Sequence, residues 1–483
     1  MCADIRHFAN HHAQLSETVM QDSPIQRLDP ELIARYDVSG PRYTSYPTAV
    51  QFTDQFDEKS FARAVGDSNG APIPAPLSIY VHVPFCRQLC FYCACNKLVT
   101  QDTAKAVEYL DLLEREAQLH SKLVDPDREV RQLHLGGGSP TFLDDAQLER
   151  LIGILDQYFK LNRQGEWSIE IDPRTVTVER MKHLAKLGFN RVSFGVQDIN
   201  EAVQAAVNRV QSLEETRACI QAARDVGMKS VSVDLIYGLP LQTLESYSET
   251  LDEVERLAPD RIAIYNYAHL PERFKAQRLI QRHQLPSAET KLSLQELIRE
   301  RLLAAGYVHI GMDHYAKPDD ELVNALHNGS LQRNFQGYST HAECEMIGMG
   351  VSSISAIGNS FAQNSHRLPE YRERVLAGHI PIIRGLHLSE DDQVRAQLIS
   401  QIMCQMKIDK DDFLQHFGVE FDRYFERDIH ALEHQLKQMQ DDGLLEPYDT
   451  GYRVSETGRY FLRNVAMCFD RYNQASEKFS KVI

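Results

Sequence analysis

Six short apolar runs, separated by longer amphipathic stretches, follow one another between about residues 76 and 305. Runs of this length predict buried strands, and the stretches between them are long enough to form helical crossovers. Regular alternation of strand and helix favours a parallel sheet with right-handed connections. We therefore expect an α/β fold, a partial (β/α)6 barrel, with strands at 77–83, 132–136, 168–172, 191–195, 230–235 and 261–266.

The segments on either side of these repeats have a different character. Residues 1–75 are polar and contain the Pro/Tyr-rich stretch SGPRYTSYPTA at 39–49, so we expect an N-terminal extension that covers the barrel mouth. Residues 306–388 are expected to complete the barrel and to connect it to a mainly helical domain at 389–483. Within that domain, 441–465 indicates a helix end, two strands and a helix, a winged-helix pattern whose mixed charge favours a structural lid over a DNA reader.

The charge of the chain limits its partners. A formal net charge of −16 at pH 7 opposes broad affinity for nucleic acid. The first thirty residues lack the continuous apolar core of a signal peptide, and no later apolar run is long enough to span a bilayer. We expect a cytoplasmic protein with neither a nucleic-acid nor a membrane partner. A polyanionic substrate would require local arginines.

Polar or glycine-rich residues follow nearly every predicted strand. In barrels of this kind the loops at the carboxyl ends of the strands converge on one mouth, where the chemistry takes place. We therefore expect a functional site built from these strand ends. The residues concerned are Cys86 to Cys95, Gly136 to Ser139, Glu170, Asp172, Gln197, Asp198, Asp234, Asn266 and His269.

Four of the nine cysteines lie within ten residues, in the segment FCRQLCFYCAC at 85–95. Three thiolates on one loop can hold three corners of an iron–sulfur cubane and leave the fourth iron open to a ligand. A closed zinc site usually needs a second cysteine pair, which the chain lacks. The spacing favours an open catalytic cluster on Cys86, Cys90 and Cys93. A zinc site, or an electron-carrying cluster with Cys95 as fourth ligand, stays open as an alternative.

The C-x3-C-x2-C spacing after the first strand is typical of the radical S-adenosylmethionine superfamily. Motifs spread from about residue 30 to the carboxyl end resemble, more closely, the oxygen-independent coproporphyrinogen III oxidases (dehydrogenases). Because the match includes accessory regions, it is more specific than the cysteine spacing. The motifs are SGPRYTSYPTA, YVHVPFC, CNKLVT, GGGSPT, GVQD, VNR, DLIYGLP, YNYAHLP, GMDHYAKPDDEL and RNFQGY.

The resemblance implies a radical S-adenosylmethionine oxidoreductase of haem (porphyrin) biosynthesis on a partial radical-SAM barrel. In that family one 4Fe-4S cluster reduces S-adenosylmethionine to methionine and a 5′-deoxyadenosyl radical, which removes hydrogen from a propionate. Each of two propionates of coproporphyrinogen III then loses carbon dioxide and one further electron, and the two become the vinyl groups of protoporphyrinogen IX. The resemblance also implies two S-adenosylmethionine molecules and a reduced flavodoxin- or ferredoxin-like electron donor. We expect a monomer.

The family pattern implies roles for particular residues. Cys95 is expected to be a catalytic thiol, with Cys86, Cys90 and Cys93 as the metal ligands. Which cofactor contact serves which S-adenosylmethionine stays unassigned. The expected contacts are Tyr80, Tyr92, Gly137, Gly138, Ser139, Glu170, Gln197, Arg209, Asp234, Ala268 and Ile354.

The chemistry of these residues suits such a ligand without the analogy. Glycines at 136–138 expose backbone groups to a polar ligand, although a tight strand-to-helix turn would also explain them. Glu170 and Asp234 can accept hydrogen bonds from ammonium or ribose groups, and Arg209 can fork onto a carboxylate. Ala94 stands where the family often has glycine, and a positive φ there would strain it.

A substrate with four propionates needs cations. Arg42 and Arg333 are the candidates, with Lys317 behind them, and a surface ion pair is the alternative for each. His314 is left without a role. Among competing functions, a haem chaperone of the same superfamily generally lacks the cysteine after the third ligand, so Cys95 favours the oxidase. A radical methyltransferase is a second alternative, and an electron-transfer protein with four cysteine ligands is a third.

Overall fold

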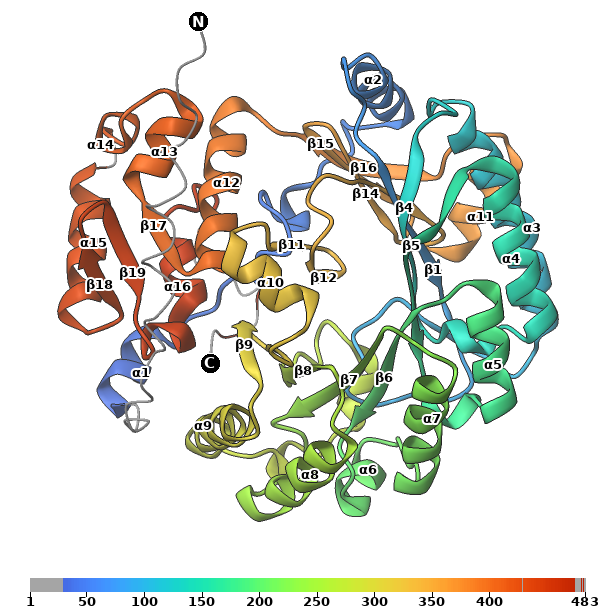
Figure 1. Ribbon diagram of the computed structural model, residues 1–483, viewed down its shortest axis with the longest axis horizontal. Helices are drawn as coiled ribbons and strands as arrows, with labels where there is room; N and C mark the ends of the chain where they lie inside the picture. Colours follow the sequence, from blue (N-terminus) through green and yellow to red (C-terminus); the bar gives the residue numbers. More distant parts are fainter. Residues whose placement is uncertain (1–28, 428, 474–478, 480, 482–483) are drawn as a thin grey trace, which may run out of the picture.

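A single twelve-stranded sheet organises the computed structural model, which describes residues 29–427, 429–473, 479 and 481 (Figure 1). The first 28 residues of the predicted extension, including Cys2, lie outside the described residues. The sheet runs β16-β15-β14-β13-β1-β4-β5-β6-β7-β8-β10-β9. Its strands are β1 (Leu77–Val83), β4 (Glu129–Gly137), β5 (Lys160–Ile171), β6 (Arg191–Gln197), β7 (Ser230–Tyr237), β8 (Arg261–Asn266), β9 (Val308–Gly311), β10 (His314–Ala316), β13 (Glu345–Met349), β14 (Ile354–Ile357), β15 (Ser360–Asn364) and β16 (Ile382–His387).

The centre of the sheet is parallel, as the sequence predicts. β1, β4, β5, β6, β7 and β8 pair in this order, each parallel to the next. Each predicted strand coincides with or overlaps one of these six, so the partial α/β barrel is confirmed. Along β1 every residue except Tyr80 is buried, which is typical of a parallel strand covered on both faces.

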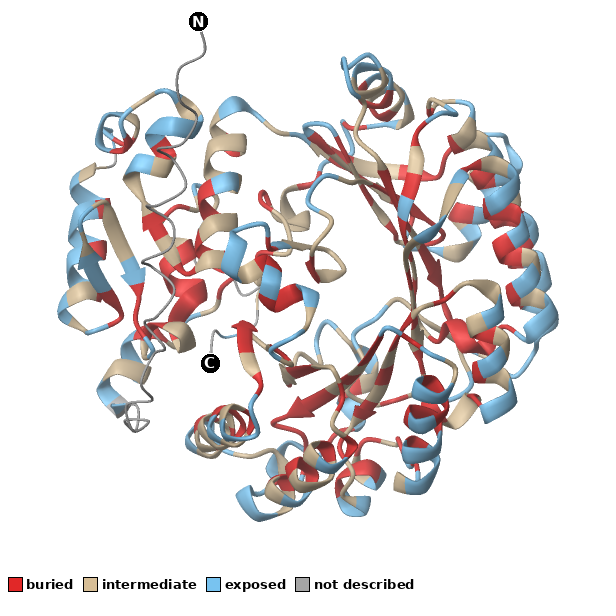
Figure 2. Ribbon diagram, viewed as in Figure 1, coloured by how far each residue is buried: buried red, intermediate tan, exposed pale blue. Residues whose placement is uncertain are grey.

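Helices cover the convex side of the curved sheet (Figure 1). Figure 2 shows that these helices are buried on the side that faces the strands and exposed on the other, so the amphipathic stretches of the sequence pack as expected. The main hydrophobic core lies between the two layers and includes the fully buried Trp167 and Tyr247. The helices are α3 (Ala104–Ser121), α4 (Asp145–Tyr158), α5 (Val178–Leu187), α6 (Glu201–Ala206), α7 (Leu213–Asp225), α8 (Leu244–Leu257) and α9 (Ala288–Ala304).

Residues 306–388 add strands to both edges of the parallel centre. β10 pairs antiparallel with β8 and carries β9, whereas β13 pairs parallel with β1 and carries the antiparallel β14, β15 and β16. The sequence did not predict these short strands individually, because glycine and serine interrupt their apolar pattern. The segment also contains α10 (Glu321–Asn328), β11 (Gln332–Asn334), β12 (Gly337–Ser339) and α11 (Leu368–Leu376).

The C-terminal region has its own hydrophobic core, to which the N-terminal segment contributes Tyr36, Tyr43 and Tyr46. Before the barrel, α1 (Pro30–Tyr36) lies beside this region and α2 (Glu58–Asn69) beside β14 and β15 (Figure 1). The strands expected within 441–465 are present as β18 and β19. The region comprises α12 (Glu390–Gln405), β17 (Lys407–Asp409), α13 (Lys410–Phe417), α14 (Phe421–Tyr424), α15 (Ile429–Asp441), β18 (Leu445–Tyr448), β19 (Gly451–Val454) and α16 (Leu462–Met467).

Among the described helices, none combines the length and the apolar character that a membrane crossing requires.

Candidate functional site

The cysteine segment forms the loop between two very short strands at the carboxyl end of β1. β2 (Phe85–Cys86) pairs in parallel with β3 (Leu98–Val99), with Cys86 opposite Val99. The Leu98 amide donates to the Pro84 carbonyl at 2.7 Å, and the Thr100 amide to the Cys86 carbonyl at 2.9 Å. These bonds close the ends of the loop and hold the intervening cysteines over the strand ends.

Three other parts of the chain fix the loop from outside. The Phe91 amide donates to Val207 O at 2.9 Å, and Asn208 Nδ2 donates to Leu89 O at 2.7 Å. On its other sides, Gln277 Nε2 donates to Tyr92 O at 3.0 Å, and Asn96 Nδ2 donates to His366 O at 2.8 Å. The loop is therefore positioned by the segments that follow β6, β8 and β15.

Twelve of the fifteen predicted site residues line one cavity at the mouth of the barrel. Tyr80, Ala268 and Ile354 do not line it. The Tyr80 ring nevertheless lies directly behind the wall, stacked on His134 with the ring centroids 5.8 Å apart. The lining residues are Cys86, Cys90, Tyr92, Cys93, Cys95, Gly137, Gly138, Ser139, Glu170, Gln197, Arg209 and Asp234.

The cysteines of the loop are free thiols whose charges influence one another. A hydrogen bond from Cys95, with Lys97 nearby, lowers the pKa of Cys93 to about 6, and burial raises the pKa of Cys86 to about 12. Neighbouring thiolates repel one another. Once Cys93 is ionised, a second cysteine of the loop therefore loses its proton readily only when a cation is present. Iron supplies that positive charge and deprotonates its cysteine ligands. The three sulfurs at one cavity therefore fit an iron–sulfur cluster.

A side chain would be crowded at each glycine of 136–138. A Cβ at Gly136 would approach Glu170 Oε1 to 2.8 Å, and one at Gly138 would approach the Pro84 backbone to 2.7 Å. Gly137 has a φ of +117° and lies against the His82 ring. The three glycines therefore form a tight turn, which is the alternative to ligand binding that the sequence analysis considered. Gly137 and Gly138 also expose backbone to the cavity.

Two carboxylates of the cavity have opposite electrostatic environments. Desolvation opposes ionisation of Glu170, but hydrogen bonds from His134 and from the Gly137 amide at 3.1 Å outweigh it, so its pKa is lowered. Desolvation and the charge of Glu170 raise the pKa of Asp234 to about 7, although Ser193 Oγ donates to Asp234 Oδ2 at 3.0 Å. Glu170 is therefore the fixed anion of the cavity, and Asp234 is a carboxyl that a ligand cation would help to ionise.

Arg209 is buried at the back of the cavity and is already partnered. Its Nη1 lies 3.5 Å from Cys90 Sγ and 3.4 Å from Asp172 Oδ2, and its Nη2 donates to Gly195 O. Asp172 also binds Arg174, with Arg174 Nη2 at 2.6 Å. Asp172, which the strand-end pattern predicted at this mouth, and Arg174, which the sequence analysis did not single out, both line the cavity. The position of Asp172 at the end of β5 was the one available signal.

The end of β6 is shaped by a strained residue. Gln197 has a φ of 69°, in the left-handed region that non-glycine residues seldom occupy, and lines the cavity. A Cβ at Gly195 would approach Gln197 Nε2 to 2.8 Å and Arg209 Nη2 to 3.0 Å. Gly195, which the sequence interpretation missed, therefore makes room for both side chains. Ala94 is not among the described residues with positive φ, so the strain considered there does not arise.

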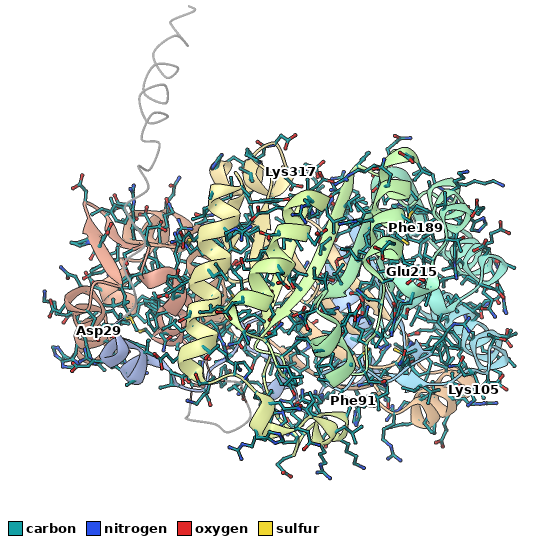
Figure 3. The ribbon with its side chains drawn as sticks, turned by 90° about the horizontal axis from the view of Figure 1, so that it is seen from below. Asp29, Phe91, Lys105, Phe189, Glu215 and Lys317 are labelled. Atoms are coloured by element: carbon teal, nitrogen blue, oxygen red, sulfur yellow. The ribbon has the colours of Figure 1, made fainter. Side chains whose placement is uncertain are left out.

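The candidate substrate cations lie apart from the cluster loop. Arg42 donates to Asp313 Oδ2 and to Asn266 O, each at 3.2 Å, and Arg333 Nη1 donates to Arg42 O. Burial and the nearby arginines lower the pKa of His314 to about 3, so this imidazole is neutral. Lys317 is placed differently from the prediction. It pairs with Asp260 at 3.0 Å, and Figure 3 shows it at the edge of the molecule opposite Phe91 of the cluster loop.

Two known sequence families match the chain. The radical SAM superfamily matches residues 80–254, and the HemN C-terminal domain matches residues 388–461. The oxygen-independent coproporphyrinogen III oxidase of Pseudomonas aeruginosa is 46% identical over 461 residues, 95% of this chain and 99% of that enzyme. The enzyme of the same name from Escherichia coli is 44% identical over 465 residues, 95% of this chain and 100% of that enzyme.

A solved structure extends the similarity to three dimensions. The coproporphyrinogen III oxidase (HemN) of Escherichia coli, described as a radical SAM enzyme, superimposes with a TM-score of 0.85 at 43% sequence identity. The match covers 92% of this chain and all of that one. The similarity therefore includes the barrel and the regions that flank it.

Proposed function

Since the chain belongs to the family of oxygen-independent coproporphyrinogen III oxidases, we propose that its barrel mouth carries out the oxidative decarboxylation of coproporphyrinogen III. It is a radical S-adenosylmethionine oxidoreductase of haem biosynthesis. Two propionate side chains of the substrate become vinyl groups, and protoporphyrinogen IX is the product.

The convergence of three free thiols with polar strand ends at one cavity supports this function most directly. Cys86, Cys90 and Cys93 would hold the cluster. When bound, the cluster and S-adenosylmethionine supply the electron and the carbon radical. The residues of this chain orient these groups and shield them from water.

The cavity also suits S-adenosylmethionine. Glu170 and Asp234 offer acceptors to the ammonium and ribose groups, and Arg209 offers a guanidinium to the carboxylate. The amides and small side chains of Gly137, Gly138 and Ser139 border the same space. We propose two S-adenosylmethionine molecules, as in the family pattern. Tyr80, Ala268 and Ile354, which lie outside the cavity lining, are proposed contacts of the pair without assignment to either molecule.

Cys95 is proposed as a catalytic thiol rather than a fourth ligand. It lines the same cavity and donates a hydrogen bond to Cys93. With a single residue between it and Cys93, Cys95 stands beside the proposed ligands and borders the space in which the reactants would lie. A thiol in this position can deliver a proton or a hydrogen atom.

Substrate carboxylates are proposed to bind at Arg42 and Arg333. The two arginines are linked through the Arg42 carbonyl, and Arg42 reaches the end of β8 at Asn266 O. An arginine that donates to a substrate carboxylate forms a charge-assisted hydrogen bond, which is stronger than a neutral one. Arg42 and Arg333 would therefore supply the local positive charge that a tetracarboxylate needs on a chain that is acidic overall.

The remaining expectations concern the surroundings of the reaction. We propose that a reduced flavodoxin- or ferredoxin-like protein supplies electrons, because radical chemistry of this superfamily needs a reductant. A cytoplasmic location is proposed because all described cysteines are free, which suits a reducing compartment. We also propose a monomer, as expected from the sequence.

An anaerobic assay with reconstituted protein, S-adenosylmethionine, dithionite and coproporphyrinogen III tests the function. The expected result is release of two carbon dioxide molecules for each protoporphyrinogen IX formed, with 5′-deoxyadenosine and methionine. A methyltransferase would instead alkylate its substrate without releasing carbon dioxide. A haem chaperone would bind haem and leave the porphyrinogen unchanged. Either of these outcomes contradicts the proposal.

A further inference from the structure

A small exposed surface lies directly over the strand pair that carries Cys86. It consists of Arg87, Val99, Gln101 and Lys105, and we call it the β3 patch. Val99 pairs with Cys86 in register and is 43% exposed. Gln101 Nε2 donates to the Arg87 carbonyl at 2.6 Å, and Lys105 follows four residues later in the first turn of α3. Figure 3 shows Lys105 and Phe91 of the cluster loop at the same edge of the molecule.

The β3 patch is basic on a strongly acidic chain. Residues 86–107 contain three basic residues and one acidic residue, Asp102, whereas the whole chain carries −16. Arg87 and Lys105 are exposed, and neither forms an ion pair with a carboxylate in the part of the chain that the structure describes. The Arg87 guanidinium lies over the Phe142 ring, 5.3 Å from its centroid, and also borders the site cavity, so Lys105 is the charge of the patch that lies outside the cavity lining. The next carboxylate along α3, Glu108, is paired with Arg372 at 2.9 Å. The amino end of the 18-residue α3 adds a positive partial charge.

Charge and position together define the partner. An acidic protein approaching this molecule is repelled overall, but beyond about 10 Å salt screens that repulsion, so the local charge decides where it docks. The β3 patch offers positive charge around one exposed apolar side chain, Val99. Val99 pairs directly with Cys86, a predicted cluster ligand. Electron carriers bind through small contacts and need close approach to the metal centre.

A second basic segment, 272–283, suits another ligand. It contains Arg273, Lys275, Arg278 and Arg282, with Glu272 as its one acidic residue. The positive charges of Arg282 and Lys291 lower the pKa of His269 in addition to its desolvation, which places Arg282 near the residues that follow β8. This segment therefore lies near the end of β8, where Arg42, a proposed substrate ligand, donates to Asn266 O. The β3 patch instead adjoins the Cys86 end of the cluster loop, through the pairing of Val99 with Cys86.

We propose that the β3 patch is the docking surface for a small acidic electron-transfer protein. At each encounter one electron passes from the reduced carrier to the cluster held by Cys86, Cys90 and Cys93. The carrier is oxidised by one electron and the cluster is reduced by one, with no proton or atom transferred. The proposal rests on the proposed function, because a reductant is needed only if the cluster is catalytic.

Binding to the cluster-free protein tests the surface without using the reaction. Titration calorimetry with oxidised flavodoxin at about 0.02 M salt should give a Kd that rises about three- to tenfold in Lys105→Glu. The double variant Arg87→Glu/Lys105→Glu should show at least a tenfold rise. The controls Lys186→Glu and Lys186→Glu/Lys229→Glu change the net charge by the same amount as the single and the double test variant. Both lysines are exposed and precede β6 and β7, at the ends of the strands opposite the cluster loop. These matched controls should bind nearly as the unaltered protein does.

Electron delivery gives a second readout. In stopped-flow measurements, reduction of the reconstituted cluster by flavodoxin hydroquinone should slow at least threefold in Lys105→Glu, and the difference should shrink at about 0.2 M salt. Cleavage of S-adenosylmethionine driven by dithionite should stay unchanged in this variant, because Lys105 lies on the outer surface of α3.

Three results would overturn the proposal. One is a flavodoxin affinity of Lys105→Glu that equals that of the unaltered protein. Another is an equal loss in Lys105→Glu and Lys186→Glu, which would reflect net charge alone. The third is a higher KM for coproporphyrinogen III in dithionite-driven turnover of Lys105→Glu, which would assign the β3 patch to the substrate. Failure of the proposed function is distinguishable, because the unaltered protein would then show no cleavage with dithionite.

Discussion

Individual thiols differ in what their removal should do. Substituting Cys86, Cys90 or Cys93 by Ala should abolish the four-iron cluster in reconstituted protein, because two thiolates cannot hold three corners of the cubane. Iron and sulfide analysis with electron paramagnetic resonance would measure this. Cys219→Ala is the matched control, since Cys219 is buried beneath Val176 O and lies outside the cavity lining. Full iron content in all three ligand variants would refute the assignment.

Cys95→Ala should give the opposite pattern. Its cluster should form normally while turnover falls, because Cys95 lines the cavity without being one of the three proposed ligands. Loss of the cluster in this variant would make Cys95 a fourth ligand and would favour an electron-carrying site.

Arg209 separates a binding role from a structural one. If its guanidinium receives the methionine carboxylate, Arg209→Ala should weaken S-adenosylmethionine binding by roughly ten- to a hundredfold, since such a bond contributes about 1.5–3 kcal/mol. Anaerobic equilibrium binding measures the loss, and Arg256→Ala, at an exposed position, is the control. The alternative is that Arg209 only pairs with Asp172. The variant would then lose thermal stability and keep its cofactor affinity.

The pKa of Asp234 predicts a pH effect with a defined sign. Its folded-state value of about 7 exceeds the ordinary 3.8, so between these values the folded protein keeps a proton that the unfolded chain has released. Because the unfolded state then binds fewer protons, the free energy of unfolding falls as pH rises from about 4 to 7. A pKa difference of one corresponds to about 1.4 kcal/mol, so this contribution totals up to about 4 kcal/mol.

Asp234→Asn removes that ionisation. The melting temperature of the cofactor-free variant, relative to the unaltered protein, should therefore be higher at pH 8 than at pH 5. Thermal denaturation at the two pH values checks it, with Asp225→Asn on the exposed end of α7 as control. A difference between the two proteins that does not change with pH would mean that Asp234 titrates normally.

At the scale of elements, a buried carboxylate joins the sheet edge to its helices. Glu116 of α3 is fully buried and accepts hydrogen bonds from Gly350 N at 2.8 Å, Asn364 Nδ2 at 2.6 Å and Tyr371 Oη at 2.5 Å. These partners come from the turn after β13, from β15 and from α11. The carboxylate thereby holds the turn that leads to Ile354, a proposed cofactor contact.

Glu116→Ala should lower the free energy of unfolding by about 3 kcal/mol or more, because it leaves several buried donors without an acceptor. Urea denaturation of the cofactor-free protein measures the change. Glu108→Ala, at an exposed position of the same helix, should cost well under 1 kcal/mol. A similar decrease in the free energy of unfolding in both variants would show that the buried hydrogen bonds of Glu116 add no stability beyond that of an exposed carboxylate.

Elements also differ in how far the sequence predicts them. β1 and β8 have the predicted bounds because each is a short, mostly apolar run with a clear end: prolines flank β1 at 76 and 84, and Arg261 and Asn266 are the end residues of β8. β13 completes the sheet beside β1, yet its residues EMIGM carry no comparable signal. Its place depends on pairing with a strand more than 250 residues earlier. Local pattern cannot encode such a partner.

The site shows the same limit. Strand ends could be predicted to meet, because parallel strands share one mouth. The partners of Arg209 could not, since Asp172 and Cys90 reach it from separate loops. The predicted position of Lys317, behind the two substrate arginines, was wrong for the same reason. Its motif follows residues of the mouth in the sequence, but in the structure the Lys317 side chain pairs with Asp260.

Across the whole molecule, the N-terminal segment links the C-terminal region to the barrel mouth. Arg463 of α16 is 5% exposed and donates to Pro41 O at 2.8 Å and to Gly40 O. The next residue, Arg42, then reaches Asn266 O at the end of β8. The C-terminal region thus holds in place an arginine proposed to bind the substrate, although none of its described residues lines the cavity.

Substituting Arg463 should therefore affect the substrate and spare the cofactor. Arg463→Lys keeps a donor but loses the planar fork that spans two carbonyls, so the 40–42 backbone should shift and misplace Arg42. The KM for coproporphyrinogen III should rise about tenfold, while S-adenosylmethionine affinity and cluster content stay unchanged. Arg453→Lys, exposed on β19 of the same region, is the matched control. Equal loss of both ligands would show that Arg463 only stabilises the fold, and an unchanged KM in a folded variant would show that Arg42 is positioned without it.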